Sequence, residues 1–127
     1  MEESTEIQLL KEFKQQITLF FDQLIDLLPN SSELILGRIF VTDQSNIEDV
    51  MKIFVFKFLP LKEHIISRDF AFFLENNSIF ENIDNNKVKK FKKIWRTIDN
   101  EDRNAIWNWI ILFINFAERY QRINISN

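Results

Sequence analysis

Residues 4–29 read STEIQLLKEFKQQITLFFDQLIDLLP, and this segment is the strongest indication of the fold class. Its large apolar residues recur in steps of three and four, at Ile7, Leu10, Phe13, Ile17, Phe20, Leu24 and Leu27. An α-helix turns once every 3.6 residues, so such steps place apolar side chains along one side of it. Pro29 cannot continue a helix because it lacks a backbone N–H group. The pattern predicts a long amphipathic helix between Ser4 and Pro29.

The composition also favours helices. The chain has 127 residues with one Gly and two Pro, whereas β-sheet proteins normally need more turn-forming residues. Hydrophobic residues make up 46% of the chain, and 14 of the residues are Phe, which is enough for a core without disulfides. No cysteine is present, which excludes disulfide and thiolate chemistry. We predict an all-α fold, with residues 1–127 forming a single compact bundle of five or six helices.

Two further helices are predicted between Pro29 and Pro60. Ser31 or Ser32 can cap a short helix that runs to about residue 41, and Gly37 inside it suggests a close helix crossing. Ser45 and Glu48 have the spacing of a capping box before the apolar segment 47–59. That segment is rich in β-branched and aromatic residues, which a strand also tolerates. Its length and its cap favour a buried helix, and we expect this helix and the last one to be central.

Short polar signals mark the starts of the remaining helices. Pro60 suits the first turn of a helix, and Asp69 is placed to cap a short segment after a change in apolar phase. A polar connection covers residues 76–86, and an amphipathic helix follows over residues 87–98. Asp99 then caps a last helix that should reach about residue 122.

The charge balance and the apolar runs limit the classes of partner. The net charge is -3 and the isoelectric point is about 5.2, whereas a dedicated nucleic-acid binder is usually more basic. No apolar run approaches the roughly 20 residues that cross a bilayer, and the N-terminal segment lacks the features of a secretory signal. We therefore expect a soluble cytoplasmic protein with no membrane partner.

His64 is the only histidine and the first candidate for chemistry. A general base needs a positioned partner, and a metal site needs three or four ligands. Glu63, Asp69 and Glu75 lie near in sequence, but they form no recognised ligand or catalytic spacing. We interpret His64 as a partly exposed helix residue and Asp69 as a cap, with Arg68 paired to a carboxylate. The expectation is a non-enzyme that needs no metal and no cofactor.

A run of basic residues is the best nucleic-acid signal in the chain. Six cations fall within residues 87–96, and four of them lie opposite the Phe91 and Trp95 side of the predicted helix: Lys89, Lys92, Lys93 and Arg96. Such a face can hold phosphates. Phe91 and Trp95 sit at core spacing, so they are not expected to stack on bases. A solvated helix face is the simpler interpretation of the same pattern.

Residues 106–116, IWNWIILFINF, are apolar almost all round the predicted last helix. Asn108 and Asn115 are the only polar residues in this segment, and they lie on one narrow line. Two explanations remain open. The helix is central and wrapped by the others, or part of it is an interface between copies of the chain. On the second explanation the contact residues are Trp109, Phe113 and Phe116, and a twofold homodimer is the commonest closed assembly.

Two segments resemble small helical proteins of unknown function that nucleocytoplasmic large DNA viruses encode. They are FLPLKEHIISRDFAFFL (58–74) and FKKIWRTIDNEDRNAIWNWI (91–110). The shared pattern rests on Pro60, Lys62, Ile65, Asp69, the pair Phe72–Phe73, Trp95 and Trp107. Phe70 stands where the pattern would have a second acid. The resemblance implies an all-helical protein from a large DNA virus, and it implies no enzymatic activity.

These observations lead to two functional expectations. The first is a non-enzymatic viral or virus-associated interaction protein that acts through protein–protein contacts in the cytoplasm or viral factory of the infected host cell, with packaging in the virion as an additional destination. The second is a nucleic-acid-associated accessory factor that uses the basic residues 87–96.

Overall fold

The computed structural model describes residues 4–75 and 85–126 of the chain. Every regular element in these residues is a helix, so the predicted all-α fold class is confirmed. The chain divides into two compact units, one built from residues 1–60 and 113–127 and the other from residues 61–112. That residues 1–127 form a single domain stays a prediction.

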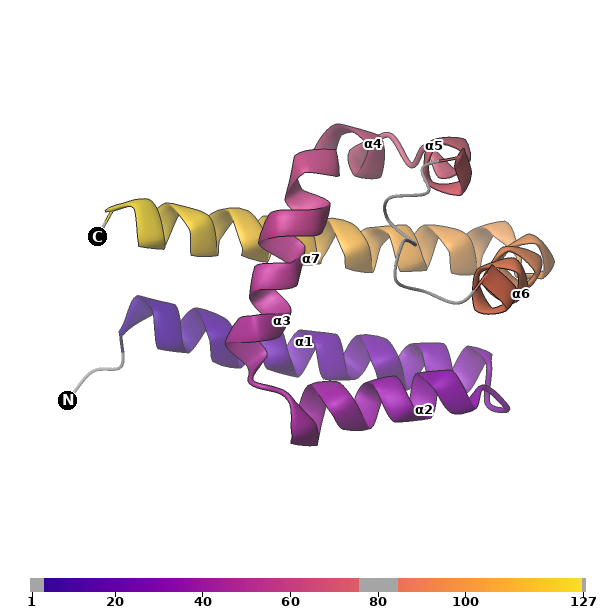
Figure 1. Cartoon of the computed structure of the whole chain (residues 1–127), viewed down its shortest axis with the longest axis horizontal. Helices are drawn as coiled ribbons and strands as arrows, with labels where there is room; N and C mark the ends of the chain where they lie inside the picture. Colours follow the sequence, from indigo (N-terminus) through magenta and orange to yellow (C-terminus); the bar gives the residue numbers. More distant parts are fainter. Residues whose placement is uncertain (1–3, 76–84, 127) are drawn as a thin grey trace. The chain divides into compact units, whose positions relative to one another are not determined.

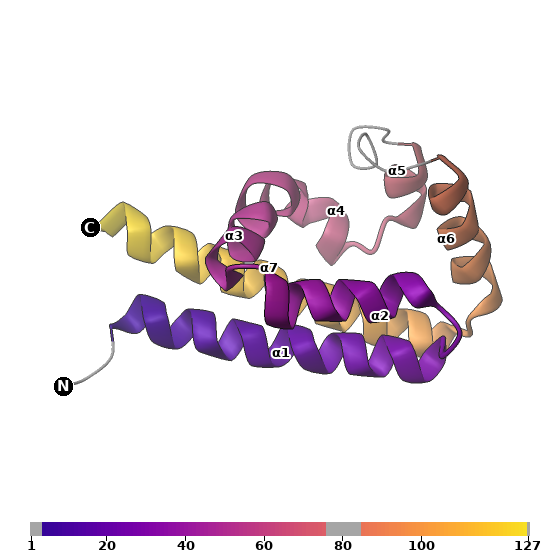
Figure 2. The ribbon, with the colours of Figure 1, turned by 60° about the horizontal axis from the view of Figure 1, so that its bottom comes forward.

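The first unit begins with two helices that run side by side (Figures 1 and 2). They are α1 (Thr5–Leu27) and α2 (Ser32–Ile39), and α2 continues into one π-helical turn, Phe40–Gln44 (η1). The hydroxyl oxygen of Ser4 accepts a hydrogen bond from the N–H of Ile7 at 3.1 Å, and that of Ser31 accepts one from Leu34 at 3.4 Å. The predicted start of the first helix at Ser4 is confirmed, and of the two predicted alternatives for the second cap the structure uses Ser31.

A third helix, α3 (Ile47–Ile53), is followed by a second π-helical turn, Phe54–Phe58 (η2). The segment is helical as predicted, but two details of the prediction were wrong. The cap is Asn46, whose side-chain oxygen accepts from the N–H of Glu48 at 3.0 Å, while Ser45 bonds back to the preceding turn. The helix is also not buried on all sides, since Phe56 is 74% exposed.

Phenylalanine rings fill the core of the first unit. Phe13 of α1 is 0% exposed, and its ring centroid lies 5.7 Å from Phe54 and 5.8 Å from both Phe113 and Phe116. The rings meet edge-on or tilted, the arrangement that the charge distribution of an aromatic ring favours. Phe113 and Phe116 belong to the last helix, α7 (Asn100–Ser126), which contributes residues to both units.

Gly37 marks the closest approach of α2 to α1. A β-carbon added at this position would lie 3.0 Å from Cε1 of Phe21, which is tighter than nearly all real contacts of that kind. The close crossing predicted from the glycine is confirmed. The missing side chain lets the α2 backbone rest on the ring of Phe21.

The second unit consists of short helices and the first part of α7. A 3-10 turn, Leu59–Leu61 (η3), contains Pro60, which therefore does not stand in the first turn of an α-helix as predicted. The helices that follow are α4 (Lys62–Ile66), α5 (Phe70–Glu75) and α6 (Asn85–Thr97). Most of the connection predicted over residues 76–86 lies outside the described residues.

Both predicted aspartate caps of the second unit are confirmed. Asp69 accepts a hydrogen bond from the N–H of Phe72 at 3.1 Å, and Asp99 accepts one from Asp102 at 2.8 Å. The tryptophans lie in an aromatic cluster, in which the Trp95 ring stacks on Phe70 at 4.8 Å and meets Trp107 edge-on at 5.7 Å. Trp95 is 6% exposed, as its spacing predicted.

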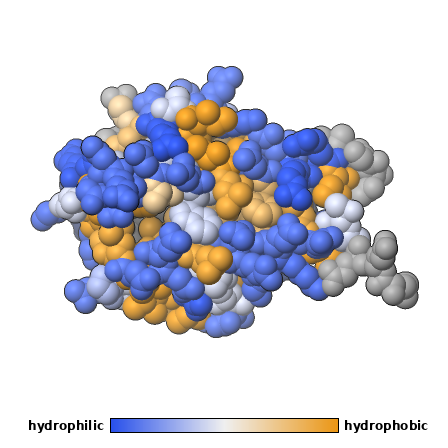
Figure 3. Space-filling view, turned by 180° about the vertical axis from the view of Figure 1, so that it is seen from behind, coloured by the Kyte–Doolittle hydropathy of each residue, from blue (hydrophilic) through white to orange (hydrophobic). Residues whose placement is uncertain are grey.

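No helix within the described ranges has the length and apolar character needed to cross a membrane. The surface is mixed, and on the face drawn in Figure 3 apolar residues reach the surface in several places between hydrophilic ones.

Candidate functional site

Four large apolar residues form an exposed row on the outer side of α2 and its extension. Ile35 is 44% exposed, Leu36 65%, Ile39 37% and Phe40 51%. Residues that are one, four and five positions apart share one side of a helix. We refer to these four residues as the α2 stripe. It is a continuous apolar surface on one short element.

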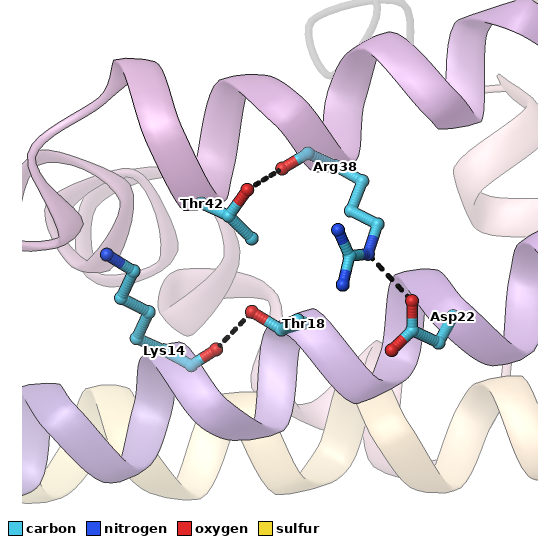
Figure 4. Close-up of polar contacts among 5 residues, drawn as sticks. All are labelled: Lys14, Thr18, Asp22, Arg38 and Thr42. Atoms are coloured by element: carbon cyan, nitrogen blue, oxygen red, sulfur yellow. Dashed lines mark hydrogen bonds and ion pairs between the residues drawn. The ribbon is translucent and has the colours of Figure 1, made fainter.

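The opposite side of α2 carries the half-buried Leu34 together with Gly37 and Arg38, and Figure 4 shows Arg38 and Thr42 on the side toward α1. Gly37 lies against Phe21, and Nε of Arg38 donates a hydrogen bond to Oδ1 of Asp22 at 2.7 Å. The hydroxyl of Thr42 donates to the carbonyl oxygen of Arg38 at 2.9 Å. Val41, in the extension, is the one buried apolar residue of residues 32–44.

α2 therefore differs from an ordinary surface helix in having an apolar outer side. Such a helix turns its apolar side to the core and its polar side to water. No residue of Ser32–Ile39 is buried, and the exposed side of the helix is the apolar one. Exposed apolar area of this kind typically marks a contact surface.

An open hollow of about 780 Å³ lies between α1 and α2. Lys11, Lys14 and Arg38 line it together with Asp43, and Asp22 holds the Nε of Arg38, so charges of both signs meet there. The hydroxyl of Thr18 donates to the carbonyl oxygen of Lys14 at 2.7 Å, so its proton is used inside α1. The three cations exceed the two acids by one, but two of the cations, Lys11 and Arg38, already have interaction partners.

The structure brings His64 and Asp69 near each other at the surface. Nδ1 of His64 lies 3.6 Å from Oδ2 of Asp69, and its ring stacks on Phe72 with the centroids 3.6 Å apart. Both side chains are more than 40% exposed, and Asp69 also serves as a cap. The predicted pairing of Arg68 with a carboxylate was wrong, because its terminal nitrogens donate to the amide oxygens of Asn104 and Asn108. No group of three metal-ligating side chains occurs within residues 4–75 and 85–126. The absence of catalysis stays a prediction.

The predicted basic residues all lie on α6. Lys89, Lys93 and Arg96 are exposed, whereas Lys92 is half-buried and has an interaction partner. Three of the four therefore present their charge to water as predicted, and Lys92 lies toward the edge of that face. The exposed three define what we call the α6 basic face.

The predicted interface on the last helix needs a correction. Phe113 is 1% and Phe116 6% exposed, because both pack on Phe13, and Phe113 also meets Phe20 and Phe54. These two rings belong to the core of the first unit and are not available to a partner. Trp109 is half-buried. Of the two explanations for the apolar helix, burial within the chain holds for Phe113 and Phe116.

Sequence reasoning missed the α2 stripe, although the segment LILGRIFV (34–41) contains its signal. Six of these eight residues are large and apolar, and one helix face cannot hold them all. The only glycine of the chain lies in their midst and marks the side that touches α1. The apolar residues on the side of the helix opposite Gly37 must then face solvent.

The chain matches no protein-family model, no curated protein and no solved structure. Its function is therefore inferred from its own surfaces.

Proposed function

We propose that the protein is a non-enzymatic interaction protein and that its α2 stripe packs against the same stripe of a second copy, forming a homodimer. The observation that carries the proposal is the apolar outer side of α2, which faces water while Arg38 and Gly37 face α1. A twofold interface places one surface against itself, so it requires a patch that is complementary to its own copy. A stripe of Ile, Leu and Phe without an internal charge meets that requirement.

The size of the stripe sets the expected strength. The four exposed fractions of 44, 65, 37 and 51% amount to about two whole side chains, or roughly 350 Å² of apolar area per copy. A standard stable interface buries roughly 800 Å² per partner, including its polar rim. The stripe can therefore form the apolar centre of a small interface, and we expect a weak, concentration-dependent dimer.

The charges at the end of the stripe favour an antiparallel pairing. Glu33 lies in the first turn of α2, about four to five residues before the middle of the stripe. In an antiparallel pair the two copies of Glu33 are separated by roughly 13 Å along the helix axis, given a rise of about 1.5 Å per residue. That separation exceeds the screening length of roughly 8 Å at physiological salt. A parallel pair would bring the two carboxylates together.

The proposed setting is the infected host cell. The resemblance of residues 58–74 and 91–110 to helical proteins of large DNA viruses supports a viral or virus-associated protein that acts in the cytoplasm or viral factory. In this proposal the protein uses no cofactor and contacts other proteins.

Sedimentation velocity over a concentration series tests the dimer. We expect wild type to shift from monomer to dimer as its concentration rises, and Leu36→Glu to stay monomeric at every concentration. Leu36 is 65% exposed, so the substitution should leave the fold intact. Ile7→Glu is the matched control, because Ile7 is 50% exposed on α1 outside the stripe and should dimerise like wild type.

Two outcomes would contradict the proposed dimer. Wild type could remain a monomer at the highest concentrations, in which case a second copy does not cover the stripe. Alternatively, Leu36→Glu and Ile7→Glu could dimerise equally well, in which case another surface forms the contact. Circular dichroism of each variant checks that a loss of dimer is not a loss of fold.

A second candidate function is nucleic-acid association through the α6 basic face. The observation that favours it is the exposure of Lys89, Lys93 and Arg96 along one helix. Fluorescence anisotropy with labelled single- and double-stranded oligonucleotides tests it, with the triple Glu variant of these residues as comparison. Phosphate binding weakens steeply with salt. Absence of binding by wild type at low salt, or equal binding by the triple variant, rejects this function.

A further inference from the structure

A cavity of about 500 Å³ in the second unit is lined by three arginines. Arg68 comes from the corner between α4 and α5, Arg96 from the end of α6, and Arg103 from the first part of α7. Trp95 and Trp107 supply apolar wall. The cavity shares no residue with the α2 stripe, and only Arg96 belongs also to the α6 basic face.

Arg68 is held in position from both ends. Its backbone lies in the left-handed region at φ 57°, and it is the only non-glycine residue with positive φ in the described part of the chain. Its two terminal nitrogens donate to Oδ1 of Asn104 at 2.8 Å and to Oδ1 of Asn108 at 2.6 Å. A guanidinium group has five N–H donors, so these two bonds leave three for a ligand.

Arg103 is fixed in a similar way. Its Nε donates to the carbonyl oxygen of Trp95 at 2.9 Å, and one terminal nitrogen donates to that of Arg96 at 3.0 Å. Its guanidinium carbon lies 6.0 Å from the centroid of the Trp95 ring, within reach of a cation–π contact. These bonds orient the group and again leave three of its five N–H donors.

The charge of the cavity wall is not compensated within the wall. Among the described residues that line it there are three guanidinium groups and two asparagines, and no carboxylate. The acids of the first turn of α7 lie outside this lining, and the carboxylate of Asp99 already accepts the N–H of Asp102. The paired N–H donors of a guanidinium group match the oxygens of a phosphate group. Arginine side chains that other hydrogen bonds already hold in place lose little conformational entropy when they bind it.

We propose that this cavity binds a phosphate group, with Arg68, Arg96 and Arg103 as its donors. Two sources share this chemistry, namely free phosphate and the backbone of a nucleic-acid strand. The exposed lysines of α6 lie on the same helix as Arg96 and would favour the second source. The cavity itself does not depend on the proposed dimer.

Tryptophan fluorescence provides the test, because Trp95 and Trp107 form part of the wall. Wild type is titrated with inorganic phosphate and, separately, with a short single-stranded oligonucleotide, each against sodium chloride of equal ionic strength. The variant is Arg96→Gln, whose side chain is exposed, while only its backbone carbonyl accepts the Arg103 bond. Lys93→Gln removes an exposed charge of the same helix outside the cavity and is the matched control.

We expect Arg96→Gln to weaken binding about tenfold or more, since a hydrogen bond to a charged group contributes at least that factor. Lys93→Gln should stay within about threefold of wild type in the phosphate titration. A response to inorganic phosphate identifies a site for free phosphate. A response to the oligonucleotide alone identifies a backbone site in the cavity if Arg96→Gln weakens it and Lys93→Gln does not, whereas an equal loss in both variants assigns the response to the α6 basic face and overturns the proposal. Saturation with neither probe, or equal affinity of Arg96→Gln and wild type for both, overturns the proposal. Thermal unfolding of each variant confirms that it is folded.

Discussion

At the scale of single residues, Arg68 occupies a place that a glycine normally fills. The N–H groups of Arg68 and Asp69 bond back to Ile65 and His64, which is how a helix ends when its next residue is left-handed. A residue with a β-carbon pays about 1 kcal/mol for this conformation. The two side-chain hydrogen bonds of Arg68 to Asn104 and Asn108 offset this strain, which explains why an arginine is tolerated here.

Two substitutions of Arg68 separate backbone strain from the side-chain bonds. Arg68→Ala and Arg68→Gly both lose the contacts with Asn104 and Asn108, but only alanine keeps the strained β-carbon. We expect the glycine variant to be more stable than the alanine variant by about 1 kcal/mol in urea unfolding. Equal stabilities, or a more stable alanine variant, would show that the left-handed conformation carries no strain.

Tyr120 is the only tyrosine, and its environment disfavours the phenolate. Burial raises the pKa of Tyr120 to about 12, and the nearby carboxylates of Glu48 and Glu6 add to that increase. The folded protein therefore holds the phenol proton more tightly than the unfolded chain, whose tyrosine pKa is about 10. This stabilisation is complete below pH 10 and is lost as the pH rises toward 12.

Absorbance at the phenolate band measures this prediction directly, because a single phenol contributes. The midpoint for the folded chain should lie near pH 12, and that for the chain in denaturant near pH 10. Tyr120→Phe should lose less stability than wild type across the same interval. A folded chain that titrates near pH 10 would show that the ring of Tyr120 is open to water.

At the scale of the element, local chemistry made most helix starts predictable. A short polar side chain can accept a hydrogen bond from the N–H group three residues later, as Ser4, Asp69 and Asp99 do. Such a cap can be recognised from four consecutive residues of the sequence. The assignment to Ser45 failed because the preceding π-helical turn extends to that residue and engages it. Asn46, one position later, is the first residue free to cap.

Gly37 allows a prediction about how α2 is attached. We expect Gly37→Leu to destabilise the fold by about 1–3 kcal/mol, since its side chain would enter the space of the Phe21 ring. Ile39→Leu, an exchange of similar volume on the exposed stripe, should change stability little. Denaturant unfolding compares the two variants. A Gly37→Leu variant as stable as wild type would show that the space between α2 and the Phe21 ring can accommodate a leucine side chain.

At the scale of the whole molecule, the sequence predicted the class of fold but not the use of each apolar surface. The apolar segment 106–116 is compatible with a core and with an interface, because the same residues serve both. Phe113 became core only because Phe13 and Phe54, about 100 and 59 positions earlier, supply rings against it. The cavity of Arg68, Arg96 and Arg103 likewise joins residues whose proximity no local pattern encodes.

In the proposed dimer the α2 stripe of one copy packs on that of the other, and the distance between two spin labels measures this pairing. The chain has no cysteine, so Ser32→Cys places a single label at the exposed start of α2. In an antiparallel pair the two labels should lie about 20 Å apart, from an offset of roughly 16 Å along the axis and a helix separation of about 9 Å. We expect this distance at high protein concentration and its loss in the Leu36→Glu background. A dimer with no distance below about 40 Å between the labels would contradict the claim.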